Sequence, residues 1–197
     1  MKPKLILIGG GGHCSSCIDV IEQENKFDIA GIVDDAIESS TRFGYPILGG
    51  DSELPSLREK YDYILITVGQ IKSPTPRVRL FEYARSIGFQ FATVISPRAY
   101  VSRQASIGKG TIVMHDALIN AYAAVGNNCI INTKSLIEHH AIIEDDCHVA
   151  TGAIINGGTV IGRGTFVGSN SVTREQQKTG DHAFIKAGSI FKGDRDD

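Results

Sequence analysis

The chain has 197 residues, enough for one large domain or two small ones, and its 42% hydrophobic and 21% charged residues are typical of a soluble globular protein. With 20 basic and 22 acidic residues the net charge is −2, and the lack of a basic block argues against nucleic acid as a partner. The opening MKPKLILIGGGGH has only four consecutive large apolar residues, too few for a signal peptide or a membrane helix, so we expect a cytoplasmic protein without membrane insertion.

The first 92 residues alternate predicted strands with predicted helices. Buried strands are expected at 4–8, 27–35 and 61–69, and helices at about 13–24 and 77–89. This alternation indicates a small parallel α/β unit, a Rossmann-like domain over residues 1–92.

From Ile95 onward a six-residue period replaces this alternation. Every sixth residue from Ile95 to Phe191 is Ile or Val at fourteen of seventeen positions. The residue two before each next member is Ala, Ser, Thr or Cys at fifteen of sixteen positions. A hexad sustained for about 100 residues is the mark of a repeat architecture, because no helix or ordinary amphipathic strand has this period.

The hexads predict a parallel β-helix over residues 93–197, with triangular turns that take three hexads each. In each short strand the small residue and the branched residue two later face inward, and stacked turns bury a continuous core. The register runs from Ile95 to Phe191 without an insertion, so we expect no long lid loop over the β-helix.

The four cysteines have a simple interpretation in this frame. Cys129 and Cys147 are separated by three hexads and are predicted to stack in the core, one turn above the other. Cys14 and Cys17 form a C-x-x-C pair, which is found in redox and zinc sites. Because no second pair lies nearby, we interpret all four as free thiols.

Three of the six histidines lie within ten residues, at 139, 140 and 148. Ile137 points inward, so His139 and His140 fall at the corner that follows, whereas His148 projects outward from the middle of a side. A corner faces the opposite side of the triangle, so His139 and His148 of one chain are more than ~10 Å apart. They cannot share a metal within one chain. They are either polar surface residues or parts of a site assembled from two subunits.

The segments LILIGGGGHC…GIVDD and NTKSLIEHHAIIEDDCHVATGAIINGGTVIG resemble the PglD/NeuD-like sugar acetyltransferases, a subfamily of the hexapeptide-repeat acyltransferases. The resemblance covers essentially the whole chain. It implies a left-handed β-helix, a homotrimer, and transfer of an acetyl group from acetyl-CoA to a nucleotide-linked amino sugar or to sialic acid. In this family the active site lies between neighbouring β-helices.

The resemblance also assigns roles to the histidines. His139 aligns with the catalytic base, and His148 with a residue near the acetyl-CoA thioester on the adjacent subunit. An unperturbed imidazole titrates near pH ~6.5, so a neutral form able to accept an amine proton is present at neutral pH. The family usually has Asp or Glu directly after the base, but His140 stands there in this chain. We therefore expect Glu138 or His140 to complete the catalytic group.

The coenzyme A contacts are expected further along the β-helix. Gly157 lies three hexads after His139, where it could leave room for the thioester or simply form a turn. The resemblance aligns Ser169 and Ala187 with residues that line the coenzyme. The ending FIKAGSIFKGDRDD lacks the common G-x-P-A-K sequence. Lys186 also occupies a position that is usually glycine.

The four glycines at 9–12 follow a strand and open a helix, so their N–H groups could hold a pyrophosphate. The dinucleotide fingerprint G-x-G-x-x-G fails at its third glycine, where Cys14 stands, which disfavours NAD. The resemblance implies phosphate contacts for Gly11, Gly12 and His13, and nucleoside contacts for Asp34 and Asp35. The alternative is that these glycines only form a tight turn. The loop at 69–77 could help select the base.

Three functions follow from these observations. The leading hypothesis is an N-acetyltransferase for a nucleotide-linked amino sugar, with acetyl-CoA as co-substrate and no metal. The second is O-acetylation of a sialic-acid-type sugar. The third, motivated by His140 and the altered C-terminal segment, is a β-helix binding protein without catalysis.

Overall fold

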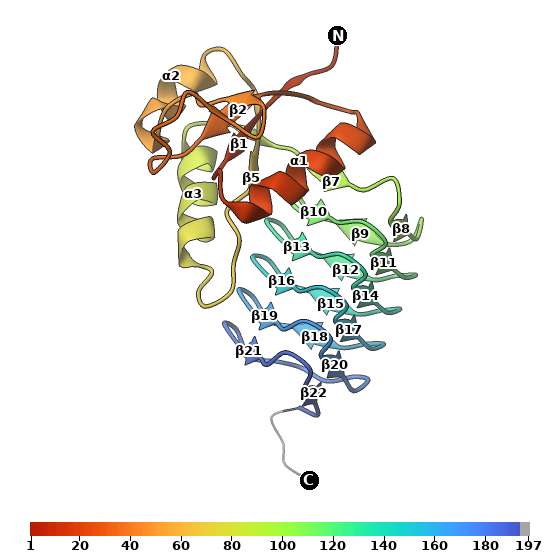
Figure 1. Cartoon of the computed structure of the whole chain (residues 1–197). Coiled ribbons are helices and arrows are strands. Elements are labelled where there is room, and N and C mark those ends of the chain that lie inside the picture. The colour runs from red at the N-terminus through yellow and green to blue at the C-terminus, as the bar shows by residue number, and fades with distance from the viewer. Residues whose placement is uncertain (194–197) are drawn as a thin grey trace.

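The computed structural model describes residues 1–193 and shows an α/β domain followed by a β-helix (Figure 1). The sheet of the N-terminal domain is parallel, in the order β2-β1-β5-β6. Its strands are β1 (Lys4–Ile8), β2 (Asp28–Val33), β5 (Tyr63–Ile66) and β6 (Gln90–Phe91). The helices are α1 (Gly12–Glu24), α2 (Leu54–Arg58) and α3 (Thr75–Ser86), with a short 3₁₀ helix at Asp51–Glu53. The fold class expected from the sequence is confirmed.

Local sequence explains where these elements lie. The LILI run of β1 is fully buried because helices and neighbouring strands cover both faces of the sheet. The third predicted strand is shorter than expected, since only Tyr63–Ile66 pairs with β1. The last predicted helix begins two residues earlier, at Thr75. The sequence did not predict α2, nor the antiparallel pair β3 (Thr41–Arg42) and β4 (Tyr45–Pro46).

The second part is a triangular solenoid with one short strand per hexad. The face toward the N-terminal domain holds β7 (Val94–Ile95), β10 (Ile112–Val113), β13 (Ile130–Ile131), β16 (His148–Val149), β19 (Phe166–Val167) and β21 (Phe184–Ile185). The second face holds β8 (Tyr100–Val101), β11 (Leu118–Ile119), β14 (Leu136–Ile137), β17 (Ile154–Ile155), β20 (Val172–Thr173) and β22 (Ile190–Phe191). The third holds β9 (Ser106–Ile107), β12 (Ala124–Val125), β15 (Ile142–Ile143) and β18 (Val160–Ile161).

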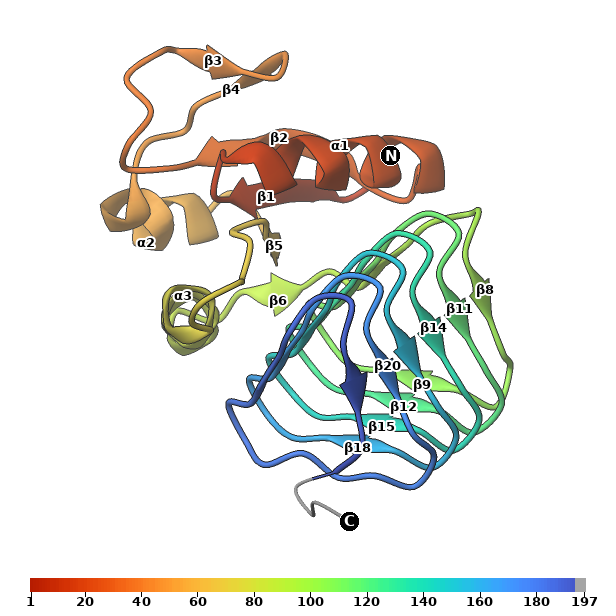
Figure 2. The same ribbon diagram turned by 60° about the horizontal axis from the view of Figure 1, so that its bottom comes forward.

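Successive turns pair with a shift of three hexads, as predicted, for example Ile112 with Ile130 and Ile130 with His148. The winding is left-handed: in Figure 2, seen from the C-terminal end, the chain passes clockwise through the three faces as it comes toward the viewer. Strands recur every hexad from β7 to β20, so no long loop interrupts this part of the solenoid.

The corners carry a fixed backbone conformation. The third residue of most corners is left-handed, for instance Asn128 at φ 54°, His140 at φ 60° and Gly158 at φ 67°. Glycine, asparagine and aspartate recur at this position because they tolerate a positive φ best.

The core of the β-helix is built as the hexads predict. Ile, Val and small residues fill the interior, and Cys129 and Cys147 are fully buried within it. Cys14 and Cys17 are also buried and free, on the face of α1 that packs against the β-helix. Burial raises the pKa of the Cys14 thiol to about 11, which makes it a poor nucleophile.

The two parts share one apolar interface, which the sequence did not predict. Cys17 and Ile21 of α1 pack against the outward side chains of the first turns, Val94, Ile112 and Ile130. Both views show α1 lying along this face (Figures 1 and 2).

A polar chain borders this interface. His115 Nε2 contacts Asp19 Oδ2 at 2.7 Å, and its Nδ1 contacts Ser96 Oγ at 2.6 Å. The hydrogen bond from His115 lowers the pKa of Asp19. Within residues 1–193, no helix combines the length and apolar character needed to span a bilayer.

Candidate active site

A cavity of about 590 Å³ opens where the N-terminal sheet meets the β-helix. It lies at the carboxyl ends of β1, β2 and β5, the edge at which parallel α/β sheets bind ligands. Its lining comes from both domains: Gly9, Gly11, Gly12, His13, Asp34, Thr67, Val68, Gly69, Gln70, Ile71, Asn132 and His148.

The four glycines of the loop divide into two pairs. A Cβ on Gly9 would lie 2.5 Å from Val68, and one on Gly10 would lie 2.3 Å from Ile37, so packing requires these two. Gly11 and Gly12 have no atom within 4 Å of such a Cβ. Gly11 is the N-cap of α1, without a side-chain cap and with no acidic residue in the first turn. The amino end of α1 is therefore open to an anion.

His13 lines this cavity as a neutral ring. Burial, and after it the nearby guanidinium of Arg77, lower the pKa of His13 to about 3. Its Nε2 lies 3.4 Å from Cys17 Sγ. Burial raises the pKa of the Cys17 thiol, so the thiol keeps its proton.

The two aspartates have different surroundings. Asp34 lines the cavity, but its carboxylate accepts hydrogen bonds from the N–H groups of Gly10 at 2.7 Å and Ala36 at 2.9 Å. Asp35 lies outside the lining, and its carboxylate accepts from the N–H of Asp51 at 3.0 Å. Both therefore fix the loops around the cavity.

His148 projects outward from β16, as expected, but its own N-terminal domain covers it. It is 7% exposed, and its Nδ1 donates to the Gln70 carbonyl at 2.5 Å. Nε2 lies 3.2 Å from the Asn132 amide nitrogen, which donates to it. Burial, partly offset by the Gln70 hydrogen bond, lowers the pKa of His148 to about 4. The ring is therefore neutral, with a single tautomer.

His139 and His140 lie at the corner between β14 and β15. Together with Gly157, Gly158, Glu175 and Gln176 they line a pocket of about 230 Å³. Their Nδ1 atoms are 3.2 Å apart, and the His140 ring stacks on Tyr122 with centroids 5.1 Å apart. His140 thus occupies the place expected for an acid and contacts the His139 ring.

Gly157 stacks one turn from His139, as the three-hexad spacing predicts. A Cβ at Gly157 would lie 2.8 Å from His139 Cε1 and 3.0 Å from its Nε2. The space we expected for a thioester is filled by the imidazole.

The Glu138 carboxylate is turned away from the His139 ring. Its Oε2 accepts from the Asn120 amide at 2.8 Å and from the backbone N–H of His139 at 3.1 Å. It fixes the corner backbone, and the ring nitrogen is paired with His140 instead.

Ser169 and Ala187 lie on another corner, between the first and second faces. The Ser169 carbonyl accepts from the N–H of Gly188 at 2.9 Å, and Ala187 packs against Gly168. The corner of His139 is opposite the face that carries His148. One chain therefore has two separate groups of candidate residues, the cavity and the histidine corner.

Sequence reasoning placed Gln70 and Arg77 in the loop at 69–77 without a role of their own, and it missed Asn132. Residues 75–77 of that stretch begin α3. Arg77 is fully buried in the first turn of α3. Arg77 is the first residue of the predicted helix, and nothing in the sequence pattern there indicates that an arginine would be buried. In residues 1–193 no group of three or more His, Cys, Asp or Glu side chains is placed to hold a metal ion.

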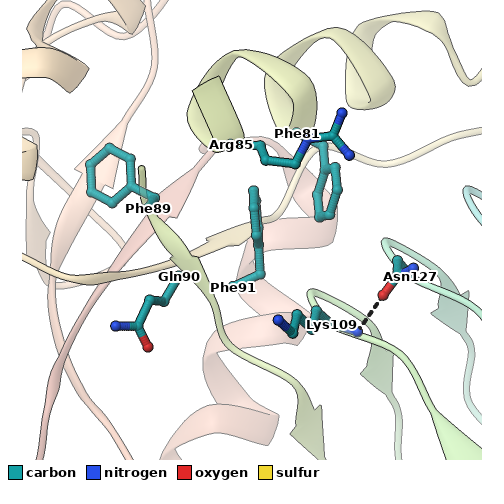
Figure 3. Close-up of a pocket in the computed structure, with 7 residues that line it drawn as sticks. All are labelled: Phe81, Arg85, Phe89, Gln90, Phe91, Lys109 and Asn127. Carbon is teal, nitrogen blue, oxygen red and sulfur yellow. Dashed lines mark hydrogen bonds between the residues drawn. The ribbon is translucent and has the colours of Figure 1, made fainter. Parts of the chain in front are cut away.

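A second cavity, of about 560 Å³, lies between α3, β6 and the β-helix (Figure 3). Its lining is Phe81, Arg85, Phe89, Gln90, Phe91, Lys109 and Asn127. The rings of Phe81 and Phe91 stack with centroids 3.9 Å apart. This second cavity includes neither the glycine loop nor a histidine. We therefore place the candidate site in the first cavity, beside the glycine loop, and call that one the interdomain cavity.

Comparison with known proteins agrees with this arrangement. Residues 4–84 match the family model of the PglD N-terminal domain. The acetyltransferase domain of PglB from Neisseria gonorrhoeae is 28% identical, with a TM-score of 0.89 over 100% of this chain and 94% of that one. PerB from Caulobacter crescentus, solved with CoA and GDP-perosamine, is 29% identical, with a TM-score of 0.90 over 97% and 89%.

A histidine-to-asparagine mutant of perosamine N-acetyltransferase from the same organism, also solved with CoA and GDP-perosamine, is 28% identical, with a TM-score of 0.91 over 97% and 89%. No curated protein sequence matches the chain significantly. With a PglD N-terminal domain over residues 4–84 and a left-handed β-helix behind it, this chain is similar to the PglD/NeuD-like sugar acetyltransferases over nearly its whole length.

Proposed function

We propose that this protein transfers an acetyl group from acetyl-CoA to the amine of a nucleotide-linked sugar, with His139 as general base at an interface between subunits of a homotrimer. The interdomain cavity carries the proposal. Gly11 and Gly12 leave the amino end of α1 open there, which suits the diphosphate of a nucleotide-sugar. The complexes of PerB with CoA and GDP-perosamine support the same ligand classes.

The chemistry needs one base. The sugar amine attacks the thioester carbon of acetyl-CoA, so that a C–N bond forms and the carbonyl oxygen becomes negative. His139 accepts the amine proton through Nε2. The C–S bond then breaks, the carbonyl reforms, and the leaving thiolate takes up a proton to give CoA. Nε2 can accept only if Nδ1 carries the ring proton, and His140 Nδ1 lies at 3.2 Å to receive that hydrogen bond.

An apolar stripe on the second face supports the trimer. The outward residues of this face form one ladder, register by register: Tyr100, Leu118, Leu136, Ile154, Val172 and Ile190. Tyr100 and Ile190 are 60% and 63% exposed. In residues 1–193 no helix covers this stripe, unlike the face under α1. The stripe lies beside the corner of His139, so a second copy packed on it would approach that histidine.

Acetyl transfer can be tested by following the free thiol of CoA. The protein is incubated with acetyl-CoA and, in turn, UDP-, dTDP- and GDP-linked 4-amino sugars and a free sialic acid. We expect thiol release with one amino sugar and a product that gains one acetyl group and resists mild base, as an amide does. A base-labile ester on sialic acid would support the O-acetyltransferase instead. Binding of acetyl-CoA without thiol release from any acceptor would contradict catalysis.

We place this reaction in the cytoplasm, where acetyl-CoA is available.

A matched pair of variants separates catalysis from assembly. His139→Ala should lower kcat by ~10²–10⁴-fold, the usual contribution of a positioned base. His182→Ala changes an exposed corner histidine elsewhere on the β-helix and should leave kcat unchanged.

A further inference from the structure

The carboxyl end of β5 is tied to the β-helix by a buried arginine. Arg77, in the first turn of α3, is 0% exposed. Its Nη1 donates to the carbonyl oxygens of Ile66 at 2.6 Å and Val68 at 3.0 Å. Its Nε donates to the carbonyl of Asn128 in the β-helix at 3.1 Å. One guanidinium therefore joins both domains, since its rigid geometry directs several donors at once.

Gln70 makes a second connection from the same segment. It is 2% exposed, and its amide nitrogen donates to the carbonyls of Asp146 at 2.9 Å and Gly164 at 3.4 Å. Its own carbonyl accepts from His148 Nδ1. Asn128, Asp146 and Gly164 share one corner position in three successive turns, because each follows the one before it by three hexads. The loop after β5 thus spans three turns of the β-helix.

This arrangement costs stability. Among residues 1–193, Arg77 Nη2 and Gln70 Oε1 are buried without a hydrogen-bond partner, and no salt bridge neutralises Arg77. Apolar side chains of similar volume often replace such buried polar groups without loss of stability. Stability alone therefore does not account for a buried arginine and a buried glutamine at this place.

We infer that Arg77 and Gln70 are positioning residues that act through His148. By fixing residues 66–70 against the β-helix, they hold the Gln70 carbonyl at Nδ1 of the ring. The proton of His148 then stays on Nδ1, and the lone pair of Nε2 accepts the hydrogen bond from the Asn132 amide at the cavity wall. A bound ligand meets one tautomer in one orientation. The effect on catalysis rests on the proposed acetyl transfer, whereas the tautomer is a property of the free protein.

The first test is spectroscopic and needs no substrate. The ring nitrogens of His148 are observed by ¹⁵N NMR in the full-length protein and assigned by their loss in His148→Gln. We expect the wild type to show a protonated Nδ1 and an unprotonated Nε2. Gln70→Met keeps the side-chain length but removes its donors, and should give a mixture of tautomers. Gln90→Met, at an exposed glutamine of β6, is the control and should leave His148 unchanged.

A folded Gln70→Met protein with the wild-type His148 pattern would overturn the inference. If Gln70→Met does not fold, Gln70→Asn, which shortens the reach by one methylene, is measured under the same criterion.

The second test is kinetic. Gln70→Met should lower kcat/KM by up to ~10²-fold, as small misplacements in active sites do, while the trimer persists. Arg77→Lys keeps the positive charge but loses the planar guanidinium with its several donors. Its kcat/KM should therefore fall less than that of Gln70→Met. Arg79→Lys, an exposed arginine two residues further along α3, is the matched control and should behave as wild type. If no sugar is acetylated, the proposed function fails, and the NMR result still decides the inference.

Discussion

His139 and His140 face each other through their Nδ1 atoms, and only one of these can carry a proton while both rings are neutral. A neutral partner accepts the hydrogen bond but adds no negative charge. The imidazolium that would form in the proposed proton transfer is therefore stabilised less than it would be beside a carboxylate. The sequence could locate this pair at a corner, because hexad spacing fixes the position. It could not show that Glu138 turns to the backbone, since rotamers depend on neighbours such as Asn120.

His140→Asp restores the carboxylate at this corner. Aspartate fits the left-handed backbone, as Asp116 and Asp146 do at equivalent positions with φ of 58° and 62°. A carboxylate favours the protonated imidazole, so the acid limb of the kcat/KM profile should move up by about one pH unit. His140→Asn is the uncharged control. An acid limb that stays where it is in His140→Asp would show that the two side chains do not interact in the working enzyme.

Gly157→Ala tests the seat of the His139 ring. The new methyl group would lie 2.8 Å from Cε1, so the ring must move, and kcat should fall by up to ~10²-fold. The thermal midpoint should change little, because the ring that must move belongs to an exposed residue. Gly180→Ala, at an exposed corner with no atom within 4 Å, is the control. Full activity in Gly157→Ala would mean that the ring position does not matter.

At the scale of elements, the glycine loop combines two roles that the sequence left open. Gly9 and Gly10 are needed for packing, whereas Gly11 and Gly12 are open to the cavity. Only the tertiary neighbours Val68 and Ile37 separate these pairs. The hexads, by contrast, predicted the β-helix strands because each turn repeats the same local pattern. The contact of α1 with Ile112 and Ile130 was not predictable, since outward apolar residues of a β-helix look alike in sequence.

Gly11→Asp should separate folding from ligand binding. Aspartate is a favourable N-cap for α1, so the thermal midpoint should stay level or rise slightly. Its charge would repel a diphosphate at the same helix end, and affinity for the nucleotide-sugar should fall at least tenfold, about 1.4 kcal/mol. Calorimetry measures this affinity, with Gly11→Ser as the neutral control. Unchanged affinity in Gly11→Asp would place the phosphates elsewhere.

At the scale of the whole molecule, the N-terminal domain covers part of the first face of the β-helix, whereas the apolar stripe of the second face stays open. Leu136 lies in the middle of the open stripe, next to the corner of His139. Leu136→Lys places a charge on this surface and should convert the proposed trimer to monomers at micromolar concentration, as measured by light scattering. Tyr83→Lys, on exposed α3, is the control. A trimer that survives Leu136→Lys would rule out this face as the interface.

The central claim is that one active site takes His139 from one chain and His148 from its neighbour. The triangular turn places these residues on a corner and on the opposite face of a single chain, so neither can complete the other within it. The direct measurement mixes the inactive variants His139→Ala and His148→Ala, each with its own tag, and assays purified mixed trimers. We predict that activity partly returns, because some interfaces regain both wild-type histidines. Mixed trimers that form but remain inactive would contradict the shared site.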